Sequence, residues 1–393
     1  MLCRIEKIVN GGWGLARTDG KVVFIRAVIP GEIADVKKYE EKKGILWATE
    51  FELTETSPER ISSECPYFPL CGGCDFQHMS YSVEQKLKLE SIREVLKKIC
   101  GESAEKFEWK WETGIDIPIE EYRNTIRMQG EDGYLGFCKK SSNDIVDIED
   151  CRIAARKIRD DIAYRKALAK EKNVKSITWR VGSGIEQNSS EMTVVMTSRG
   201  NSYLEGGSVN FKFGEVIFHV SPNSFFQVNL DIAEQMVNHL KNNLPNGARL
   251  FDLFAGVGTF ALCLKEKYEK VIGMEISRDA VNDFQTNIEL NSAKNIEFKN
   301  WDAARGLKEP LRTDDIVILD PPRTGLPEKL IANLLKSKPR KIAYVSCDPA
   351  TFARDLKSLF KADYRLDGAI HLFDMFPRTA HVELLAILNG NEK

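Results

Sequence analysis

The feature that most constrains the fold is a pair of short apolar stretches, each ending abruptly at reactive residues. Ile318–Arg323 runs from apolar residues into Asp320 and two prolines, and Tyr344–Pro349 runs into Cys347. Buried apolar runs of this kind are typical of strands in an open parallel sheet. Ligands bind in such sheets at the carboxyl ends of the strands, so the carboxylate and the thiol are predicted to face one substrate.

A third segment predicts where a cofactor binds. Leu250–Ala261 reads as a strand, a tight glycine turn and a helix, in which Gly256 and Gly258 allow backbone conformations that a Cβ would block. The turn also satisfies the dinucleotide-binding pattern, so a nicotinamide enzyme is a rival interpretation. That rival does not explain a series of acids near successive strand ends, which favour a cationic cofactor without phosphates, such as S-adenosylmethionine. These acids are Asp252, Glu275, Asp302 and Asp320.

The composition sets broad limits. A chain of 393 residues is long for one core, and two or three domains are expected. The N-terminal residues lack the apolar core of a signal peptide, and no run reaches the length of a membrane span, so a cytoplasmic protein is predicted. The net charge of −2 gives no hint of nucleic acid. The nearest basic patch, which fits a solvated helix face equally well, comprises Arg152, Arg156, Lys157, Arg159, Arg165 and Lys166.

The pattern along the chain predicts three parts. Residues 1–57 alternate β-branched runs with glycine turns, which suits a small barrel of about five strands. Residues 58–220 mix a cysteine-bearing loop, a helical stripe over residues 82–99 and strand-like pieces. From residue 221 to 393, strands and helices alternate, which predicts a mostly parallel, doubly wound α/β sheet.

Three of the nine cysteines stand close together, as Cys65, Cys71 and Cys74 on a loop rich in proline and glycine. Cytoplasmic cysteines are not read as disulfides. Structural zinc more often pairs two short knuckles, whereas three clustered thiolates with one remote cysteine are familiar in iron–sulfur proteins. We favour Cys151 as the fourth ligand, with zinc and free thiols as alternatives. Cys3, Cys100, Cys138 and Cys263 are interpreted as small buried or incidental residues.

Together these residues resemble the RNA uridine-5-methyltransferase family, in the branch with an N-terminal RNA-binding barrel (a TRAM domain) and a four-iron cluster. The resemblance covers essentially the whole chain. Its matched pieces are Gly12–Ala16 through Ile29–Gly31, Cys65 with Cys71 and Cys74, Tyr122–Asn124, Gly136–Phe137, Asp147–Cys151, Ser221–Gln227, the glycine turn, Asp320–Arg323, Ser346–Pro349 and His381–Glu383.

The resemblance implies an α/β protein: a Rossmann-like methyltransferase domain at 221–393, an OB-like barrel at 1–57 and a central α+β iron–sulfur domain at 58–220, whose helix 82–99 packs on the catalytic domain. It implies a [4Fe-4S] cluster held by Cys65, Cys71, Cys74 and Cys151. Thr259 stands where some members carry asparagine, so its contact with the donor would use the backbone. The residues implied to surround S-adenosylmethionine are Gln227, Phe254, Gly256, Thr259, Glu275, Asp302 and Asp320.

The resemblance also implies the chemistry. Carbon 5 of uracil is a poor nucleophile, and addition of the Cys347 thiolate to carbon 6 would push electron density onto it. Glu383 would then remove the carbon-5 proton, with apolar Leu384 and Leu385 raising its pKa toward a useful value. A stacked base cannot reach a pocket thiol, so the uridine is expected to be looped or flipped out.

The RNA is not identified by these motifs. The barrel and the cluster favour 23S ribosomal RNA, with the T-loop uridine of transfer RNA as the alternative. Three other classes stay open: an adenine amino-methyltransferase, which needs no thiol; a cytosine-5 enzyme, which shares the thiol mechanism; and a non-catalytic iron–sulfur RNA-binding protein, which needs no acids at the strand ends. We expect a monomer without membrane partners.

Overall fold

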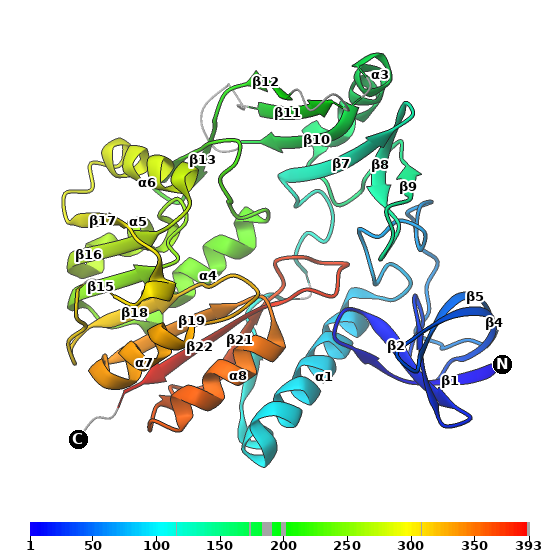
Figure 1. The fold of residues 1–393 in the computed structure, drawn as a ribbon, viewed down its shortest axis with the longest axis horizontal. Helices are drawn as coiled ribbons and strands as arrows, with labels where there is room; N and C mark the ends of the chain where they lie inside the picture. Colours follow the sequence, from blue (N-terminus) through cyan, green and yellow to red (C-terminus); the bar gives the residue numbers. More distant parts are fainter. Residues whose placement is uncertain (115, 173, 183–190, 198–201, 308, 391–393) are drawn as a thin grey trace.

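The computed structural model describes residues 1–114, 116–172, 174–182, 191–197, 202–307 and 309–390. Figure 1 shows a small barrel at the N-terminus, a six-stranded sheet and a large sheet covered by helices. No helix in these ranges is long and apolar enough to span a lipid bilayer.

The N-terminal strands close into a five-stranded barrel in the order β1-β2-β3-β5-β4. Buried and exposed residues alternate along β1, where Cys3 and Ile5 point into the barrel core. Closure leaves the sheet without free edges, and the barrel predicted from the sequence is confirmed. The strands are β1 (Leu2–Val9), β2 (Trp13–Thr18), β3 (Lys21–Ile25), β4 (Ile33–Lys42) and β5 (Ile45–Glu55).

A six-stranded antiparallel sheet, in the order β12-β11-β10-β7-β8-β9, forms the middle of the molecule. Its core includes Met128, Ile177 and Trp179, which are fully buried. Its elements are β7 (Thr125–Glu131), β8 (Tyr134–Cys138), β9 (Ile145–Asp147), α2 (Arg156–Asp160), α3 (Ile162–Lys172), β10 (Val174–Val181), β11 (Glu191–Thr197) and β12 (Ser202–Gly206).

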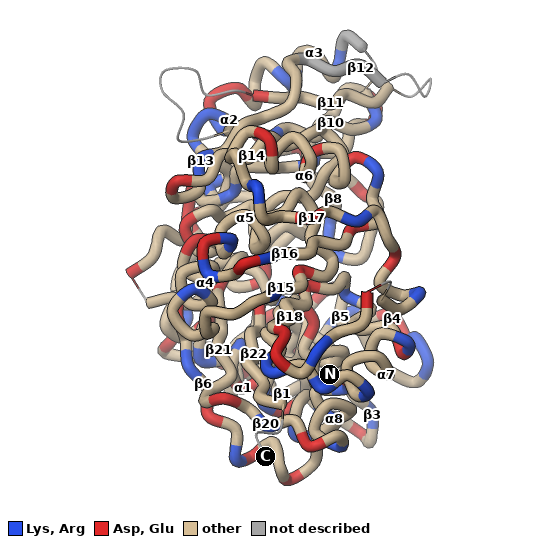
Figure 2. Tube along the Cα trace, turned by 90° about the vertical axis from the view of Figure 1, so that its left-hand side faces the viewer, with Lys and Arg blue, Asp and Glu red and all other residues tan. Residues whose placement is uncertain are grey.

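The basic residues of this middle part are paired with acids. Arg152 binds Glu120 at 2.7 Å, Arg159 binds Asp150 at 2.7 Å, and Lys166 also contacts two carboxylates. Figure 2 shows Lys and Arg interspersed with Asp and Glu along the trace. Neighbouring acids therefore neutralise much of the basic patch seen in the sequence, and its Arg165 is buried over the Trp179 ring rather than solvated.

The large sheet has the order β17-β16-β15-β18-β19-β22-β21-β6, with β20 paired to β22. The strands from β17 to β19 are parallel, and β22 is antiparallel to both β19 and β21. Along β18, Ile316 and Ile318 face one apolar cluster and Val317 and Leu319 face another, so both faces of the sheet are covered. This arrangement confirms the predicted methyltransferase fold.

The elements of this part are α4 (Leu230–Asn243), β15 (Gly247–Leu253), α5 (Thr259–Leu264), η2 (Lys265–Lys267), β16 (Tyr268–Glu275), α6 (Arg278–Leu290), β17 (Ile296–Asn300), η3 (Ala303–Arg305), β18 (Ile316–Leu319), α7 (Glu328–Ser337), β19 (Lys341–Ser346), α8 (Pro349–Phe360), β20 (Arg365–Leu366), β21 (Ile370–Phe373) and β22 (Glu383–Asn389).

Several elements before residue 221 pack onto this sheet. The helix α1 begins after its cap Ser80, and its Ile92 and Leu96 share an apolar cluster with Leu356 of α8. The strand β6 pairs with β21, and β14 accepts and donates hydrogen bonds with Asn287 of α6. The domain limits at residues 57 and 220 stay a prediction. Since β6 and β14 come before residue 221 but contact β21 and α6, the packing continues across the limit at residue 220. These elements are α1 (Tyr81–Cys100), η1 (Gly101–Lys106), β6 (Trp109–Trp111), β13 (Val209–Phe213) and β14 (Val216–Val220).

Candidate active site

A cavity of about 710 Å³, here called the donor cavity, opens at the carboxyl ends of β15, β16, β18 and β19. Thr259, predicted to contact the donor, starts α5 but does not line this cavity. The other predicted catalytic and donor-binding residues do line it: Gln227, Phe254, Gly256, Glu275, Asp302, Asp320, Cys347 and Glu383.

The glycine turn is shaped by positive backbone angles. Phe254 has φ 65° and Gly256 has φ 55°, conformations that are unfavourable for residues with a side chain. At Gly258, with φ 91°, an added Cβ would lie 2.3 Å from the Phe284 ring. Glycine is therefore required there both by the backbone and by packing.

Asp252 supports this turn from beneath and is absent from the cavity wall. It is fully buried, and one carboxylate oxygen accepts a hydrogen bond from the Ala261 N–H at 2.8 Å. Burial raises the pKa of Asp252 to about 8. This acid therefore holds the start of α5 rather than contacting a ligand in the donor cavity.

The carboxylate of Glu275 is held by backbone N–H groups. It accepts hydrogen bonds from Gly256 at 3.0 Å, Ile276 at 2.8 Å and Ser277 at 2.7 Å. These bonds fix both oxygens: Oε1 accepts the bonds from Ile276 and Ser277, and Oε2 accepts the bond from Gly256 and keeps a further lone pair. Asp302 is oriented similarly by the Ala304 N–H at 2.8 Å. Both acids are thus presented to the cavity in set positions, ready to accept hydroxyl groups.

Cys347 and Glu383 meet through strand pairing. Cys347 follows the end of β19, Glu383 begins β22, and the register pairs Ser346 with Leu384, which places the two residues at the same end of adjacent strands. Burial, together with the nearby charges of Glu383 and Asp320, raises the pKa of the Cys347 thiol to about 11, and Arg323 opposes this shift.

The two cavity acids near the thiol are poised around neutral pH. Burial raises the pKa of Asp320 to about 7. Burial raises the pKa of Glu383 to about 8, helped by Asp320 and opposed by Arg323. A carboxyl group in this range can accept or release a proton at physiological pH. The site therefore combines a thiol, a candidate base and a second acid.

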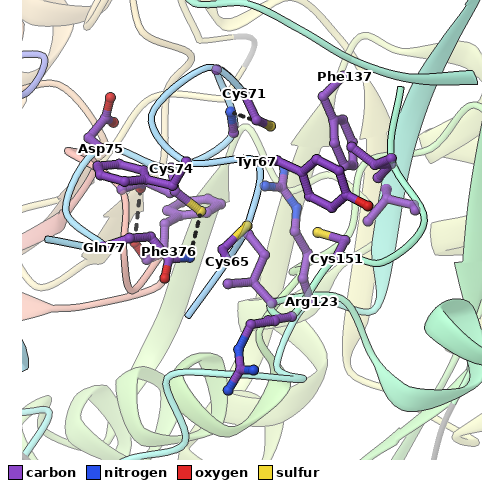
Figure 3. Close-up of a pocket in the computed structure, with 18 of the residues that line it drawn as sticks. Cys65, Tyr67, Cys71, Cys74, Asp75, Gln77, Arg123, Phe137, Cys151 and Phe376 are labelled. Carbon is purple, nitrogen blue, oxygen red and sulfur yellow. Dashed lines mark hydrogen bonds between the residues drawn. The ribbon is translucent and has the colours of Figure 1, made fainter. Parts of the chain in front are cut away.

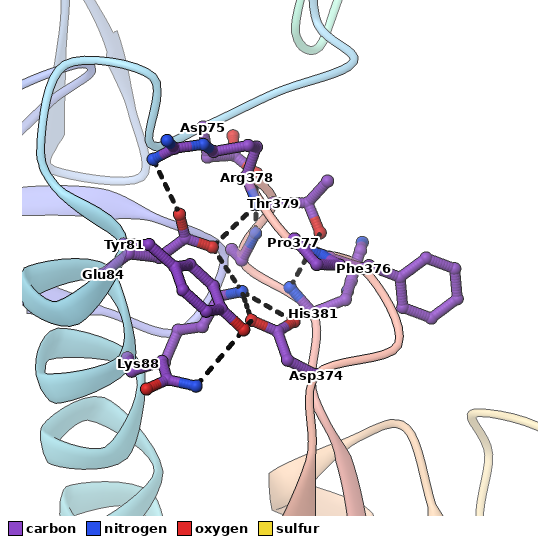
Figure 4. A network of polar contacts seen from close by, with 12 residues as sticks. Asp75, Tyr81, Glu84, Lys88, Asp374, Phe376, Pro377, Arg378, Thr379 and His381 are labelled. Atoms are coloured by element: carbon purple, nitrogen blue, oxygen red, sulfur yellow. Dashed lines mark hydrogen bonds and ion pairs between the residues drawn. The ribbon is translucent and has the colours of Figure 1, made fainter. Parts of the chain in front are cut away.

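The loop that precedes Glu383 is fixed by a buried polar network (Figure 4). The Lys88 ammonium of α1 lies 2.7 Å from Glu84 and 2.9 Å from Asp374, and all three side chains are essentially buried. Tyr81 donates to Asp374 at 3.0 Å, and the Arg378 N–H donates to Glu84 at 2.7 Å. The helix α1 thereby sets the position of residues 374–382.

A second cavity, of about 430 Å³ and here called the cysteine cavity, lies between the cysteine loop and the six-stranded sheet (Figure 3). It is lined by Cys65, Cys71, Cys74 and Cys151, and also by Cys138, which the sequence analysis treated as incidental. Burial raises the pKa of Cys151 to about 11 and that of Cys74 further still. Neutral thiols in such a site lose their protons when they bind a metal.

Some cavity residues were missed or misread in the sequence. Phe225 was not predicted as a site residue, but 66% of its surface is exposed and it lines the donor cavity, whereas its neighbour Phe226 is buried. Trp301 and Met375 also line the donor cavity. Arg323 lines both cavities. Two of these residues had a local signal in the sequence: Trp301 precedes Asp302 directly after a strand, and Arg323 ends the Asp320–Arg323 motif.

The chain is similar in sequence to known RNA methyltransferases. Residues 200–390 match the family model described as tRNA (Uracil-5-)-methyltransferase. An uncharacterized RNA methyltransferase of Aquifex aeolicus is 30% identical, with 98% of this chain and 97% of that relative covered. The 23S rRNA (uracil(1939)-C(5))-methyltransferase RlmD of Shewanella halifaxensis is 29% identical, with 98% and 94% covered.

A solved structure extends the similarity to the whole fold. The Pyrococcus abyssi tRNA (uracil-54, C5)-methyltransferase, in complex with S-adenosyl-L-homocysteine, is 28% identical with a TM-score of 0.78, covering 98% of this chain and 100% of that one. The match in sequence thus runs through the barrel, the middle sheet and the methyltransferase sheet. The chain belongs to the RNA uracil-5-methyltransferase family of methyl-transferring enzymes.

Proposed function

We propose that the protein methylates carbon 5 of one uridine in RNA, with S-adenosylmethionine as donor and Cys347 as nucleophile. The observation that carries the proposal is the convergence of Cys347, Glu383 and Asp320 on one cavity at the ends of β18, β19 and β22. A nicotinamide enzyme or a passive RNA-binding protein would have no use for this thiol beside two acids.

The donor cavity suits a cationic cofactor. Among its described lining residues, Glu275, Asp302, Asp320 and Glu383 are acids, and Arg323 is the one base. Such a wall repels the phosphates of a dinucleotide and attracts a sulfonium. Glu275 would accept the ribose hydroxyls, and Phe254 and Gln227 would lie along the adenosine and the amino acid portion. When bound, S-adenosylmethionine supplies an electrophilic methyl group.

The reacting residues follow from the cavity. The Cys347 thiolate adds to carbon 6 of uracil, forming a carbon–sulfur bond and moving electron density to carbon 5. After carbon 5 is methylated, the Glu383 carboxylate takes its proton, and the electrons of the carbon–hydrogen bond restore the ring double bond as the thiolate leaves. Arg323 stabilises the thiolate, because its charge lowers the pKa of Cys347.

The uridine reaches Cys347 only when it leaves its stack. Phe225 is an exposed aromatic side chain on the cavity wall, and such rings stack on splayed RNA bases. We therefore propose that Phe225 covers the flipped uridine or fills its former place. The barrel and the six-stranded sheet would bind the surrounding RNA. The monomeric state and the cytoplasmic location stay predictions.

We propose further that Cys65, Cys71, Cys74 and Cys151 hold a [4Fe-4S] cluster. Four thiols on one cavity supply the usual ligands of such a cluster. Tetrahedral zinc holds its sulfurs about 3.8 Å apart. The cavity that these cysteines line has a volume of about 430 Å³, which leaves room for a group larger than a single ion.

The favoured RNA is 23S ribosomal RNA, as in the Shewanella halifaxensis relative, and the alternative is the T-loop of transfer RNA, as in the Pyrococcus abyssi structure. The test incubates the protein and methyl-labelled donor with unmodified 23S transcript and, separately, with unmodified transfer RNA. Label in 5-methyluridine at one site of the 23S transcript supports the favoured target. Label in transfer RNA selects the alternative, and label in 5-methylcytidine or methyladenosine refutes the proposed reaction.

A further inference from the structure

Three potential metal ligands converge away from both cavities. Glu112 follows β6, His239 lies on α4 and His371 on β21, and one ligand atom from each lies within 4.8 Å of the others. Figure 2 labels α4, β21 and β6 along the same side of the molecule. None of the three lines the donor or the cysteine cavity, so methyl transfer makes no use of them.

Both imidazoles turn toward one carboxylate. The Nδ1 of His371 lies 2.8 Å from one oxygen of Glu112, and the Nδ1 of His239 lies 3.7 Å from the other. The two imidazole rings are in contact, with centroids 4.1 Å apart. Two nitrogens and a carboxylate oxygen, from three separate elements, thus surround one point.

The hydrogen bonding of His239 is incomplete. Its side chain is only 9% exposed, its Nδ1 contact is too long for a hydrogen bond, and its buried Nε2 has no hydrogen-bond partner among the described residues. Buried imidazoles are normally hydrogen-bonded, because a buried polar group without a partner destabilises the fold. A neutral imidazole keeps one ring nitrogen without a proton, and the lone pair of that nitrogen can bind a metal.

We propose that Glu112, His239 and His371 form a binding site for a divalent transition-metal ion of the Zn²⁺ class. Two imidazoles and one carboxylate are a typical ligand set for zinc, with water as the fourth ligand. In tetrahedral zinc, nitrogen and oxygen ligands lie about 3.4 Å apart. Small side-chain rotations would bring the three residues to that spacing.

Binding requires modest local changes. The Lys110 ammonium lies 3.0 Å from Glu112, but the Lys110 side chain is 62% exposed and is free to turn into solvent. Binding through Nδ1 of His371 uses the tautomer in which Nε2 carries the proton and Nδ1 offers its lone pair. The bound ion then joins α4 to β21 and β6, which forms the edge of the large sheet. Because the ion would link these separate elements, its expected effect is on stability.

The test uses full-length protein, purified anaerobically and treated with EDTA. Thermal unfolding is followed with ZnCl₂ and with MgCl₂, and crystals grown with ZnCl₂ are measured on both sides of the zinc absorption edge. Zn²⁺ is expected to raise the unfolding temperature where Mg²⁺ does not. An anomalous peak is expected between Glu112, His239 and His371, distinct from any iron signal at the cysteines.

Variants assign the effect to these residues. Glu112→Gln and His239→Gln should each weaken Zn²⁺ binding more than about tenfold, because even outer partners of a metal ligand are worth that much. His219→Gln, a histidine outside the trio, and Cys347→Ala should keep the shift. The proposal is overturned if no anomalous peak lies at the trio, or if Glu112→Gln responds to Zn²⁺ like the wild type. If His239→Gln does not fold, the Zn²⁺ response of Glu112→Gln and the anomalous map still test whether the ion binds at these three residues.

Discussion

Cys347 and Glu383 are neighbours because β19 and β22 run antiparallel with Ser346 opposite Leu384. The other neighbours of β19 and β18 are parallel, so the antiparallel β22 alone brings the start of a strand to the edge where the others end. A residue from the last part of the chain thereby reaches the carboxyl-end crevice, where ligands bind in this class of sheet. The thiol and the acid can act on the same base from this position.

The first prediction concerns Cys347. Cys347→Ala should abolish methylation and leave donor binding unchanged, because the thiol is needed only for addition to the ring. RNA with 5-fluorouridine at the target should form a covalent complex with the wild type that survives denaturation, and no complex with the variant. The pKa of Cys347 is raised to about 11, so adduct formation should speed up about tenfold per pH unit between 7 and 9. Cys347 is not the nucleophile if the rate of adduct formation does not change with pH and Cys347→Ala traps the RNA as well as the wild type does.

A second prediction separates the two candidate fourth ligands of the cluster. Cys138 and Cys151 both line the cysteine cavity, but the backbone of Cys138 accepts a bond from Gly72, and its sulfur contacts the Asn143 carbonyl at 3.8 Å. Cys151→Ser should therefore lose the visible absorbance and about four irons per chain, whereas Cys138→Ser keeps both. Iron analysis of anaerobic protein measures this. The reverse outcome would show that Cys138 is the ligand. Colourless protein with stoichiometric zinc would show that the site does not hold an iron–sulfur cluster.

The third prediction links the cysteine loop to the catalytic loop. Asp75 accepts a hydrogen bond from the Ala380 N–H at 3.0 Å, and its own N–H donates to the Arg378 carbonyl at 2.8 Å. Its side chain is buried and pairs with Lys140 at 2.8 Å. A hydrogen bond to such a charged group contributes about 1.5–3 kcal/mol to stability. Asp75→Asn removes the charge and so weakens the bond to Ala380, which lies in the loop that leads into Glu383.

Asp75→Asn should retain its iron and its donor affinity but lose about tenfold or more in kcat, because the base is less well positioned. Asp144→Asn is the matched control: Asp144 pairs with Lys139 at 3.2 Å in the same part of the chain but is exposed. It should keep full activity. If both variants lose the same activity, or if Asp75→Asn loses its iron, then Asp75 does not act through the catalytic loop.

The sequence alone placed those site residues whose position depends on their immediate neighbours in the chain. Asp320, Cys347 and the glycines of the turn could be placed at strand ends, because a strand that stops at a reactive residue defines its own position in a parallel sheet. Phe225 could not be placed, because an aromatic residue beside Phe226 looks the same whether it packs inward or lines a cavity. The packing of α1, and the meeting of His239 with His371, depend on contacts between distant segments that no local pattern contains.

The last prediction concerns Glu383, whose pKa burial raises to about 8. Glu383→Gln should still add Cys347 to the ring and accept the methyl group, because both steps precede proton removal. Methylated RNA should then accumulate as a covalent complex, and the methyl label should stay with the protein band after denaturation. In the wild type, release of product should rise with pH through about 8 as the carboxyl group ionises, and the variant should lack this rise.

The same shift has a consequence for stability. A buried carboxyl group with a raised pKa destabilises the folded state least while it is protonated. The contribution of Glu383 to the free energy of unfolding is therefore fully present below about pH 4 and is lost as the pH rises through 8. Glu383→Gln should therefore unfold at a higher temperature than the wild type at pH 9, and at a similar temperature at pH 4. A variant that turns over at the wild-type rate, or stops before any label is transferred, would show that another group removes the proton.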